Sequence, residues 1–112
     1  GGHPFLHRRQ FFCPFGEEKK YSFGDVFIGD NCWVGMDVFI REGVTIGNNA
    51  VVGVNSVVVN NLPPGSISVG SPAKVVKLKS YLTLDEKKKI VDEYWDSFSD
   101  KLKSELDHLR KS

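Results

Sequence analysis

The chain has 112 residues, which suits a single domain. Its 15 Lys and Arg residues nearly balance 14 Asp and Glu residues, and the formal net charge of +1 gives no general attraction to nucleic acid or an anionic membrane. Hydrophobic residues make up 40% and charged residues 26%, which is typical of a globular protein and not of a disordered one. No apolar run approaches the roughly 20 residues that span a bilayer.

The cysteine content indicates a reducing compartment. Cys13 and Cys32 are too few for a disulfide scaffold. The first residues of the sequence show neither the basic start nor the apolar stretch of a secretory signal. We therefore expect a cytoplasmic protein.

The first part of the chain, residues 5–24, shows no regular repeat and is rich in aromatic residues. Its aromatic residues include Phe11, Phe12, Phe15, Tyr21 and Phe23. We expect a protruding loop here. Its rings either contact a flat or sugar-like ligand or anchor the loop to the rest of the protein, and the sequence leaves both open.

A six-residue period follows, from Ile28 to Pro63. A β-branched aliphatic residue stands at every sixth position, namely Ile28, Val34, Ile40, Ile46, Val52 and Val58. Four of the six residues that directly follow these aliphatics are glycine. The residues four positions after each aliphatic are small or β-branched, with the exception of Leu62. An amphipathic helix would repeat every three to four residues and a hairpin sheet would alternate with period two, so both are excluded here.

This period predicts a chain that bends every six residues. Each bend needs a permissive backbone, for which we expect the glycines and asparagines to serve. Each side turns one branched aliphatic inward, and three sides of six residues close a triangular coil of 18 residues. Coils then stack about 4.8 Å apart with paired backbones. The alternative is a run of short strands in an ordinary sandwich, which the unbroken register disfavours.

Helical periodicity replaces the hexads after Thr83. Residues 83–86 have the pattern of a capping box. Apolar residues follow at helical spacing: Ile90, Val91, Tyr94, Trp95, Phe98, Leu102, Leu106 and Leu109. We expect this stripe to pack on the last coil or on a neighbouring subunit. Residues 97–100 favour helix caps, so the tail forms either one helix or two.

Several kinds of catalytic site are not supported by the sequence. A zinc site of three histidines would need His108, in the tail, beside His3 and His7, so no metal site is predicted. No nucleophile elbow, P-loop or dinucleotide fingerprint occurs. Cys32 takes an inward position and Cys13 has no base near it in sequence, so neither is expected to be a nucleophile.

Short motifs in the chain resemble those of the hexapeptide-repeat acyltransferases. They are His3-Pro4, Ile-Gly-Asp-Asn-Cys-Trp-Val-Gly at 28–35, Gly-Val-Thr-Ile-Gly at 43–47, Asn-Ser-Val-Val at 55–58, Pro63-Pro64 and Gly-Ser-Pro-Ala-Lys at 70–74. The most similar branches are the maltose and galactoside O-acetyltransferases and the xenobiotic or capsular acetyltransferases. The resemblance implies a mainly β protein, with a left-handed parallel β-helix over residues 1–79 and a helical tail over residues 80–112. Family members carry further coils before the His-Pro element, so we expect this chain to be a C-terminal portion.

The same resemblance implies an activity. It is the acetyl-CoA-dependent transfer of an acetyl group to a hydroxyl of a sugar or related small acceptor, without an acyl-enzyme and without a metal. His3 takes the position of the general base, a role that suits a side chain with a pKa near 6.5. His7 is the reserve candidate, and otherwise lines the pocket or faces solvent.

The resemblance also implies a homotrimer with acetyl-CoA bound between subunits. The residues carried over by position are Trp33 as a wall, Met36, Val54, Val59 and Asn60 along the pantetheine arm, and Lys74 and Lys77 at the phosphates. Asn60 departs from the lysine often found there in relatives, which weakens the expected CoA contact. The alternative is a non-catalytic trimerising β-helix module, or an inactive fragment, that keeps the coil and the tail without a working pocket.

Overall fold

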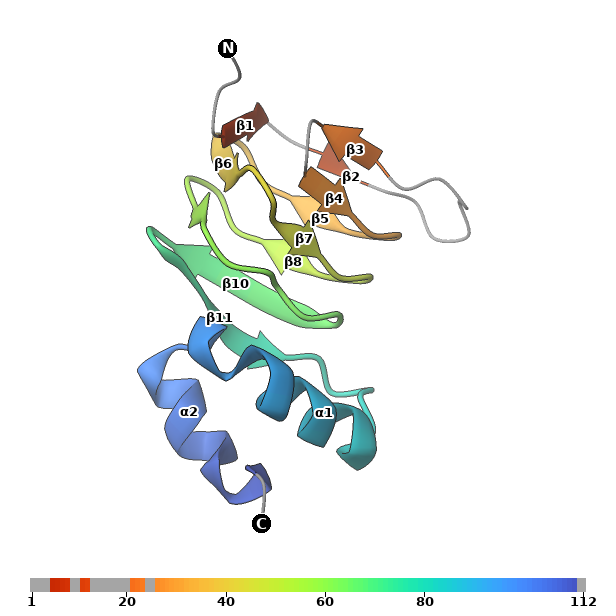
Figure 1. Ribbon diagram of the computed structural model, residues 1–112, viewed down its shortest axis with the longest axis vertical. Helices are drawn as coiled ribbons and strands as arrows, with labels where there is room; N and C mark the ends of the chain where they lie inside the picture. Colours follow the sequence, from red (N-terminus) through yellow and green to blue (C-terminus); the bar gives the residue numbers. More distant parts are fainter. Residues whose placement is uncertain (1–4, 9–10, 13–20, 24–25, 111–112) are drawn as a thin grey trace.

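A computed structural model describes residues 5–8, 11–12, 21–23 and 26–110, with side chains described from Val26 to Arg110. Figure 1 shows a stack of coils of short strands with two helices beneath it. The mainly β architecture with a helical tail, expected from the hexads and the later helical period, is confirmed. No helix in the described part of the chain is long and apolar enough to cross a bilayer.

Six short strands form the three faces of the coil, two strands to a face. The first face holds β4 (Val26–Ile28) and β7 (Thr45–Ile46), the second β5 (Trp33–Val34) and β8 (Val51–Val52), and the third β6 (Val38–Arg41) and β9 (Val57–Val58). Each pair is parallel, and partners such as Trp33 and Val51 lie 18 positions apart. The expected 18-residue coil is therefore confirmed, and the sandwich alternative is wrong.

The core is a set of stacked columns inside this coil. All six aliphatics of the hexads are fully buried. Ile28 pairs with Ile46 and Ile46 bridges to Leu62, so one column runs through three successive coils. Because each coil adds one aliphatic to a column, burial of apolar surface and backbone pairing stabilise the same stack.

The corners depend on two different residue types. A left-handed backbone, with φ between 55° and 93°, recurs every six residues at Asn31, Asp37, Gly43, Asn49 and Asn55. The glycines that follow the aliphatics do not take this conformation. At Gly47 an added Cβ would lie 2.5 Å from the backbone nitrogen of Pro64, in the next coil. The expectation that these glycines supply the bend is therefore wrong, because they allow close stacking while mostly asparagine makes the turn.

The hexad register shortens after Val58. Ile46 and Leu62, and likewise Val51 and Ile67, are partners only 16 positions apart. Leu62, which the hexads place at a corner, instead lies beside Ile46 in the core column. The coil from Ile46 to Leu62 is thus two residues shorter than the coil from Ile28 to Ile46.

A hairpin completes the second face. It consists of β10 (Ser66–Gly70) and β11 (Ala73–Leu78), which are antiparallel to each other and joined across a cis Ser71-Pro72 bond. β10 continues the parallel stack on β8, so the sheet has the order β11-β10-β8-β5-β2. β11 therefore forms the edge of this sheet on the side of the helical tail.

Three strands pair with the opposite edge of the coil. They are β1 (Phe5–Arg8), β2 (Phe11–Phe12) and β3 (Tyr21–Phe23), which run antiparallel to β6, β5 and β4 respectively. Parts of the region expected to form a protruding loop are therefore edge strands. His3 and Cys13 lie outside the described residues.

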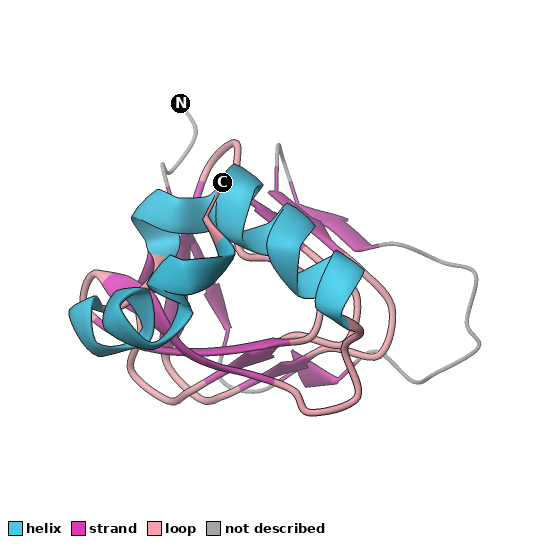
Figure 2. Ribbon diagram, turned by 90° about the horizontal axis from the view of Figure 1, so that it is seen from below, coloured by secondary structure: helices cyan, strands magenta, loops and turns pink. Residues whose placement is uncertain are grey.

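The tail forms two helices with a break between them, as Figure 2 shows from below. The elements are α1 (Leu84–Tyr94), η1 (Trp95–Ser97), α2 (Asp100–Leu106) and η2 (Asp107–Leu109). The capping box is confirmed: Glu86 N–H donates to Thr83 Oγ1 over 3.1 Å and Thr83 N–H to Glu86 Oε1 over 2.8 Å. In the break, Phe98 is buried and Ser99 N–H donates to the Val75 carbonyl over 2.9 Å, which fastens the tail to β11.

Candidate functional site

The sheet of the second face carries three of the seven residues expected to bind CoA, namely Trp33, Lys74 and Lys77. Trp33 on β5 projects outward, half-buried, and pairs with Val51, which pairs in turn with Ile67. Lys77 on β11 lies opposite Ile67 at the end of this row. The register therefore places Trp33 and Lys77 in one row across the sheet, with Val51 and Ile67 between them.

An exposed apolar column runs along the corner that follows this face. Met36 is 44% exposed, Val54 57% and Val69 42%. A Cβ on Gly35 would lie 2.8 Å from the Val54 nitrogen, and one on Gly53 would lie 2.7 Å from Val69 Cγ1, so the three corner residues stack closely. We call Met36, Val54 and Val69 the apolar strip. Large apolar side chains rarely stand exposed in a line without a partner, so the strip is a candidate binding surface.

Two lysines lie beyond the apolar strip on β11. Lys74 is opposite Val69, and its Nζ donates to the Asp96 carbonyl over 3.0 Å. This bond joins the hairpin to η1 and leaves two of the three ammonium protons for other acceptors. Lys77 is exposed. The strip thus has an apolar body and a cationic end.

Val59 and Asn60 lie elsewhere. They belong to the corner that follows the third face, after β9, whereas the apolar strip lies before that face. Asn60 lines a hollow beside Glu93 and Tyr94 of α1. A single chain therefore does not bring these two residues together with Met36 and Val54.

The histidines and cysteines add little to the described site. His3 is outside the described residues, and of His7 the structure describes only its pairing with Phe39. Cys32 is fully buried, as expected, and its thiol donates to the Gly47 carbonyl over 3.1 Å. Burial raises the pKa of the Cys32 thiol, which disfavours the reactive thiolate. Within residues 26–110, no three His, Cys, Asp or Glu side chains gather in a way that would hold a metal.

Val69 is a strip residue that the sequence did not reveal. It stands 15 positions after Val54, because the shortened coil displaces it from the hexad register. Counting the sequence in strict steps of six residues therefore does not assign Val69 to this corner.

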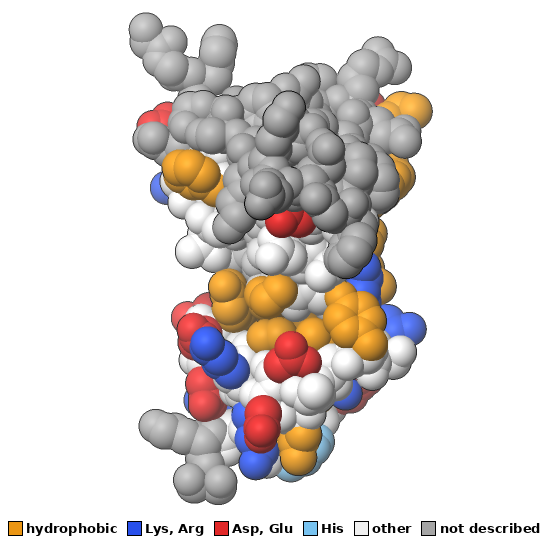
Figure 3. All heavy atoms as spheres, turned by 90° about the vertical axis from the view of Figure 1, so that its right-hand side faces the viewer, with side chains coloured by type: hydrophobic (Ala, Val, Ile, Leu, Met, Phe, Trp, Pro, Cys, Tyr) orange, Lys and Arg blue, Asp and Glu red, His pale blue; other side chains and the backbone are white. Residues whose placement is uncertain are grey.

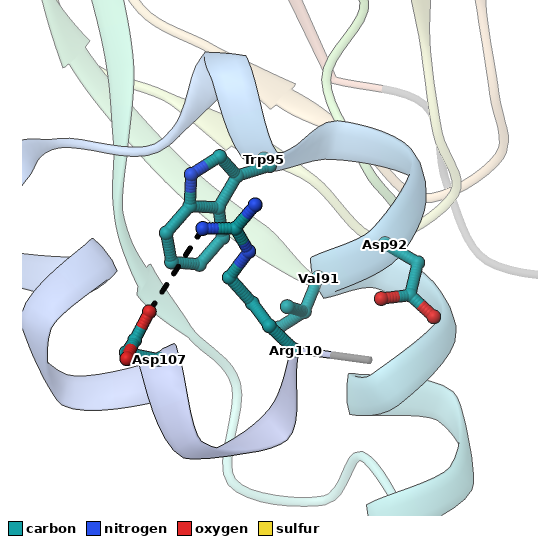
Figure 4. A pocket seen from close by; sticks show the side chains of 5 residues that line it. All are labelled: Val91, Asp92, Trp95, Asp107 and Arg110. Atoms are coloured by element: carbon teal, nitrogen blue, oxygen red, sulfur yellow. Dashed lines mark ion pairs between the residues drawn. The ribbon is translucent and has the colours of Figure 1, made fainter. Parts of the chain in front are cut away.

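A pocket in the helical tail was not expected from the sequence. It has a volume of about 660 Å³ and is lined by Val91, Asp92, Trp95, Asp107 and Arg110. Figure 4 shows the Arg110 guanidinium over the Trp95 ring, 4.3 Å from its centroid, and paired with Asp107 at 3.9 Å. The arginine already covers the indole face, so this contact holds η2 to the break between the helices.

Comparisons with known proteins agree with this geometry. A family model described as bacterial transferase hexapeptide (six repeats) matches residues 25–60. A Staphylococcus aureus (strain Mu50) protein named as an acetyltransferase is 44% identical over 77 residues, covering 67% of this chain and 35% of the relative. The galactoside O-acetyltransferase of Escherichia coli (strain K12) is 38% identical over 76 residues, covering 68% of this chain and 34% of the relative.

A solved structure gives a further match. A galactoside acetyltransferase in complex with coenzyme A is 33% identical, covers 67% of this chain and 32% of that chain, and has a TM-score of 0.49. The chain thus spans about a third of the length of the relatives it matches. The family model matches the hexad coil, and the two relatives are 44% and 38% identical in sequence. The chain therefore belongs to the hexapeptide-repeat acetyltransferase family, close to the galactoside O-acetyltransferases.

Proposed function

We propose that the protein is an acetyl-CoA-dependent O-acetyltransferase that acetylates a hydroxyl of a sugar or related small acceptor. The observation that carries the proposal is the apolar strip, which runs from the level of Trp33 to Lys74 and Lys77. The pantetheine arm of CoA is a largely apolar chain that ends in a phosphorylated nucleotide. A strip with an apolar body and a cationic end matches both parts.

The proposed chemistry requires a base, a hydrogen-bond donor that stabilises the tetrahedral oxyanion, and a held acetyl donor. His3 takes the proton of the acceptor hydroxyl as its oxygen attacks the acetyl carbonyl. The new C–O bond forms, the C–S bond breaks, and the proton passes to the leaving thiolate. No acyl-enzyme forms, and the raised pKa of the buried Cys32 thiol fits this direct route.

We further propose that the protein works as a homotrimer. Met36 and Val54 stand at one corner of the coil, while Val59 and Asn60 stand at the next, beyond the face formed by β6 and β9. If all four contact one CoA molecule, the two corners must come from different copies of the chain. Trp33 and the apolar strip would then be covered by the neighbouring copy or by the donor between them.

The proposed acceptor is a sugar because a relative that is 38% identical over the matched region is named a galactoside O-acetyltransferase. The cytoplasmic location predicted from the sequence stays a prediction.

The test is a turnover assay on the purified protein with acetyl-CoA and a panel of maltose, galactosides and other sugars. Release of free CoA thiol and an acetylated sugar in the mass spectrum are the expected results. His3→Ala should lower kcat on the order of 10²-fold, the scale of general-base catalysis. His108→Ala, at an exposed position of the tail, is the matched control, and His7→Ala tests the reserve candidate. Turnover unchanged by His3→Ala would remove His3 from its role.

Two binding measurements separate the enzyme from the alternative, a non-catalytic trimerising module. Acetyl-CoA should raise the melting temperature, because a ligand that binds only the folded state stabilises it. Sedimentation should give the mass of three chains. A trimer whose melting temperature does not respond to acetyl-CoA would support the module instead.

A further inference from the structure

A groove runs along the corner of the coil between the first and second faces. One pocket there, of about 470 Å³, is lined by residues of β4 and β7 together with Asn48 and Pro64. A second, also of about 470 Å³, lies between the same corner and α1 and is again lined by Asn48 and Pro64. The two pockets therefore adjoin at Asn48 and Pro64. We call this site the corner groove and define it by Phe27, Thr45, Asn48, Pro64, Tyr81 and Tyr94.

The corner groove has exposed apolar and aromatic walls. Phe27 at one end is 47% exposed and Tyr81 at the other is 59% exposed. In Figure 3 hydrophobic side chains form a band on this side of the molecule, at the level where the coil meets the helical tail. Rings displayed in this way can pack against a flat apolar surface of a ligand.

Side-chain amides at the corner provide hydrogen-bond donors beside these rings. Asn48 Oδ1 accepts from Asp30 N–H over 2.8 Å, and Asn49 Oδ1 accepts from Asn31 Nδ2 over 2.7 Å. These bonds fix the two amide groups through their oxygens. Among the described residues, neither Asn48 Nδ2 nor Asn49 Nδ2 donates to a protein atom, so both remain available to a ligand.

The charge of the corner groove selects against anionic ligands. Glu86 and Glu93 line it together with a single lysine, Lys89. Glu86 Oε1 accepts from Thr83 N–H, which keeps this carboxylate at the start of α1. An excess of acceptor carboxylates disfavours a phosphate or a nucleotide and suits a ligand that offers hydroxyl protons.

We propose that the corner groove binds a neutral saccharide chain. Sugar rings present C–H faces to aromatic side chains and hydroxyl groups to amides and carboxylates, which is the combination found here. The groove lies on a different corner from the apolar strip. The choice of a sugar as the ligand rests on the proposed function.

The experiment is a titration of the ¹⁵N-labelled protein with maltotriose, without acetyl-CoA. Saturable shifts are expected at the side-chain amide signals of Asn48 and Asn49. Tyr81→Ala and Phe27→Ala should each weaken binding about fivefold, the scale of one lost aromatic contact. Tyr81→Phe should retain it, and Val76→Ala, which removes an equally exposed apolar side chain from β11, is the matched control.

The outcomes separate this inference from the acetyltransferase proposal. Both aromatic positions are substantially exposed, and the melting curve of each variant checks that it folds. Absence of shifts at millimolar maltotriose, or shifts that Tyr81→Ala and Phe27→Ala leave unchanged, overturns the corner groove as a saccharide site even where the enzyme turns over. Groove shifts that depend on Tyr81, in a protein that transfers no acetyl group, support the site and contradict the enzyme.

Discussion

Asn31 and Asn49 occupy the same corner of two successive coils, and the first donates its side-chain amide to the second over 2.7 Å. Both have a left-handed backbone, with φ of 55° and 63°. The asparagine side chain tolerates this backbone better than other L residues and at the same time links one coil to the next. The corner is therefore stabilised by local conformation and by stacking together.

Replacing Asn49 tests both contributions. Asn49→Ala should lower the free energy of unfolding by about 2 kcal/mol, through strain at positive φ and the lost hydrogen bond. Asn49→Gly keeps the backbone relaxed and loses only the bond, so its effect should be about half as large. Urea denaturation measures both variants. Equal losses in the two would show that the backbone strain is not important.

Gly47 and Gly43 separate close stacking from turn conformation. Gly47→Ala places a Cβ against the Pro64 backbone and should cost about 3 kcal/mol by overpacking. Gly43 has a φ of +93° but open space around it, so Gly43→Ala should cost only about 1 kcal/mol. Chemical denaturation should rank the two in this order. The reverse order would mean that turn strain, and not coil spacing, requires glycine in this fold.

Phe98 should be the main anchor of the helical tail. It is only 1% exposed, lies 5.8 Å from Trp95 between ring centroids, and bridges to Val75. Phe98→Ala should lower the free energy of unfolding by about 3 kcal/mol or more, because it leaves a cavity between the tail and β11. Leu84→Ala, at an exposed position of α1, should cost no more than about 0.5 kcal/mol in the same experiment. Similar losses for both would contradict the anchoring role.

Glu86 should contribute to stability only above acidic pH. The hydrogen bonds from Thr83 lower the pKa of the Glu86 carboxyl below its ordinary value of 4.5. A folded-state pKa below the unfolded one means that the stabilisation is complete above the unfolded pKa and disappears as the pH falls through the folded pKa. NMR titration should find a lowered Glu86 pKa that Thr83→Ala raises only in part, because alanine keeps the backbone N–H, the larger contributor. A Glu86 pKa at its ordinary value in the unchanged protein would contradict the capping bond in solution.

Lys77 should act on binding of the acetyl donor. Lys77→Ala removes an exposed cation from β11, in the row of Trp33, and should raise the KM for acetyl-CoA about tenfold with kcat little changed, which corresponds to one charge-assisted bond. Lys88→Ala, an exposed lysine on α1, is the matched control. Steady-state kinetics at saturating acceptor measure both. A loss confined to kcat would place Lys77 outside the donor site.

The sequence predicted the coil because its pattern is local. Each hexad places one branched aliphatic inward, and all six are buried. The capping box at Thr83 could be read in the same way, since caps depend on a few neighbouring residues. For the break near Ser99 the sequence indicates a cap but does not decide between one helix and two. The family resemblance added the candidate donor residues, of which the structure aligns Trp33, Met36, Val54, Lys74 and Lys77 along one side of the coil.

The sequence by itself therefore determined which residues face the core, because periodicity records the alternation of inward and outward positions within each side. The tertiary structure alone decided how the coils meet: the two-residue shortening that brings Leu62 beside Ile46, the stacking role of Gly47 against Pro64, and the groove between Asn48 and α1. These features depend on contacts between residues that are far apart in the chain. No local pattern specifies such contacts, since they arise only when one coil packs on the next.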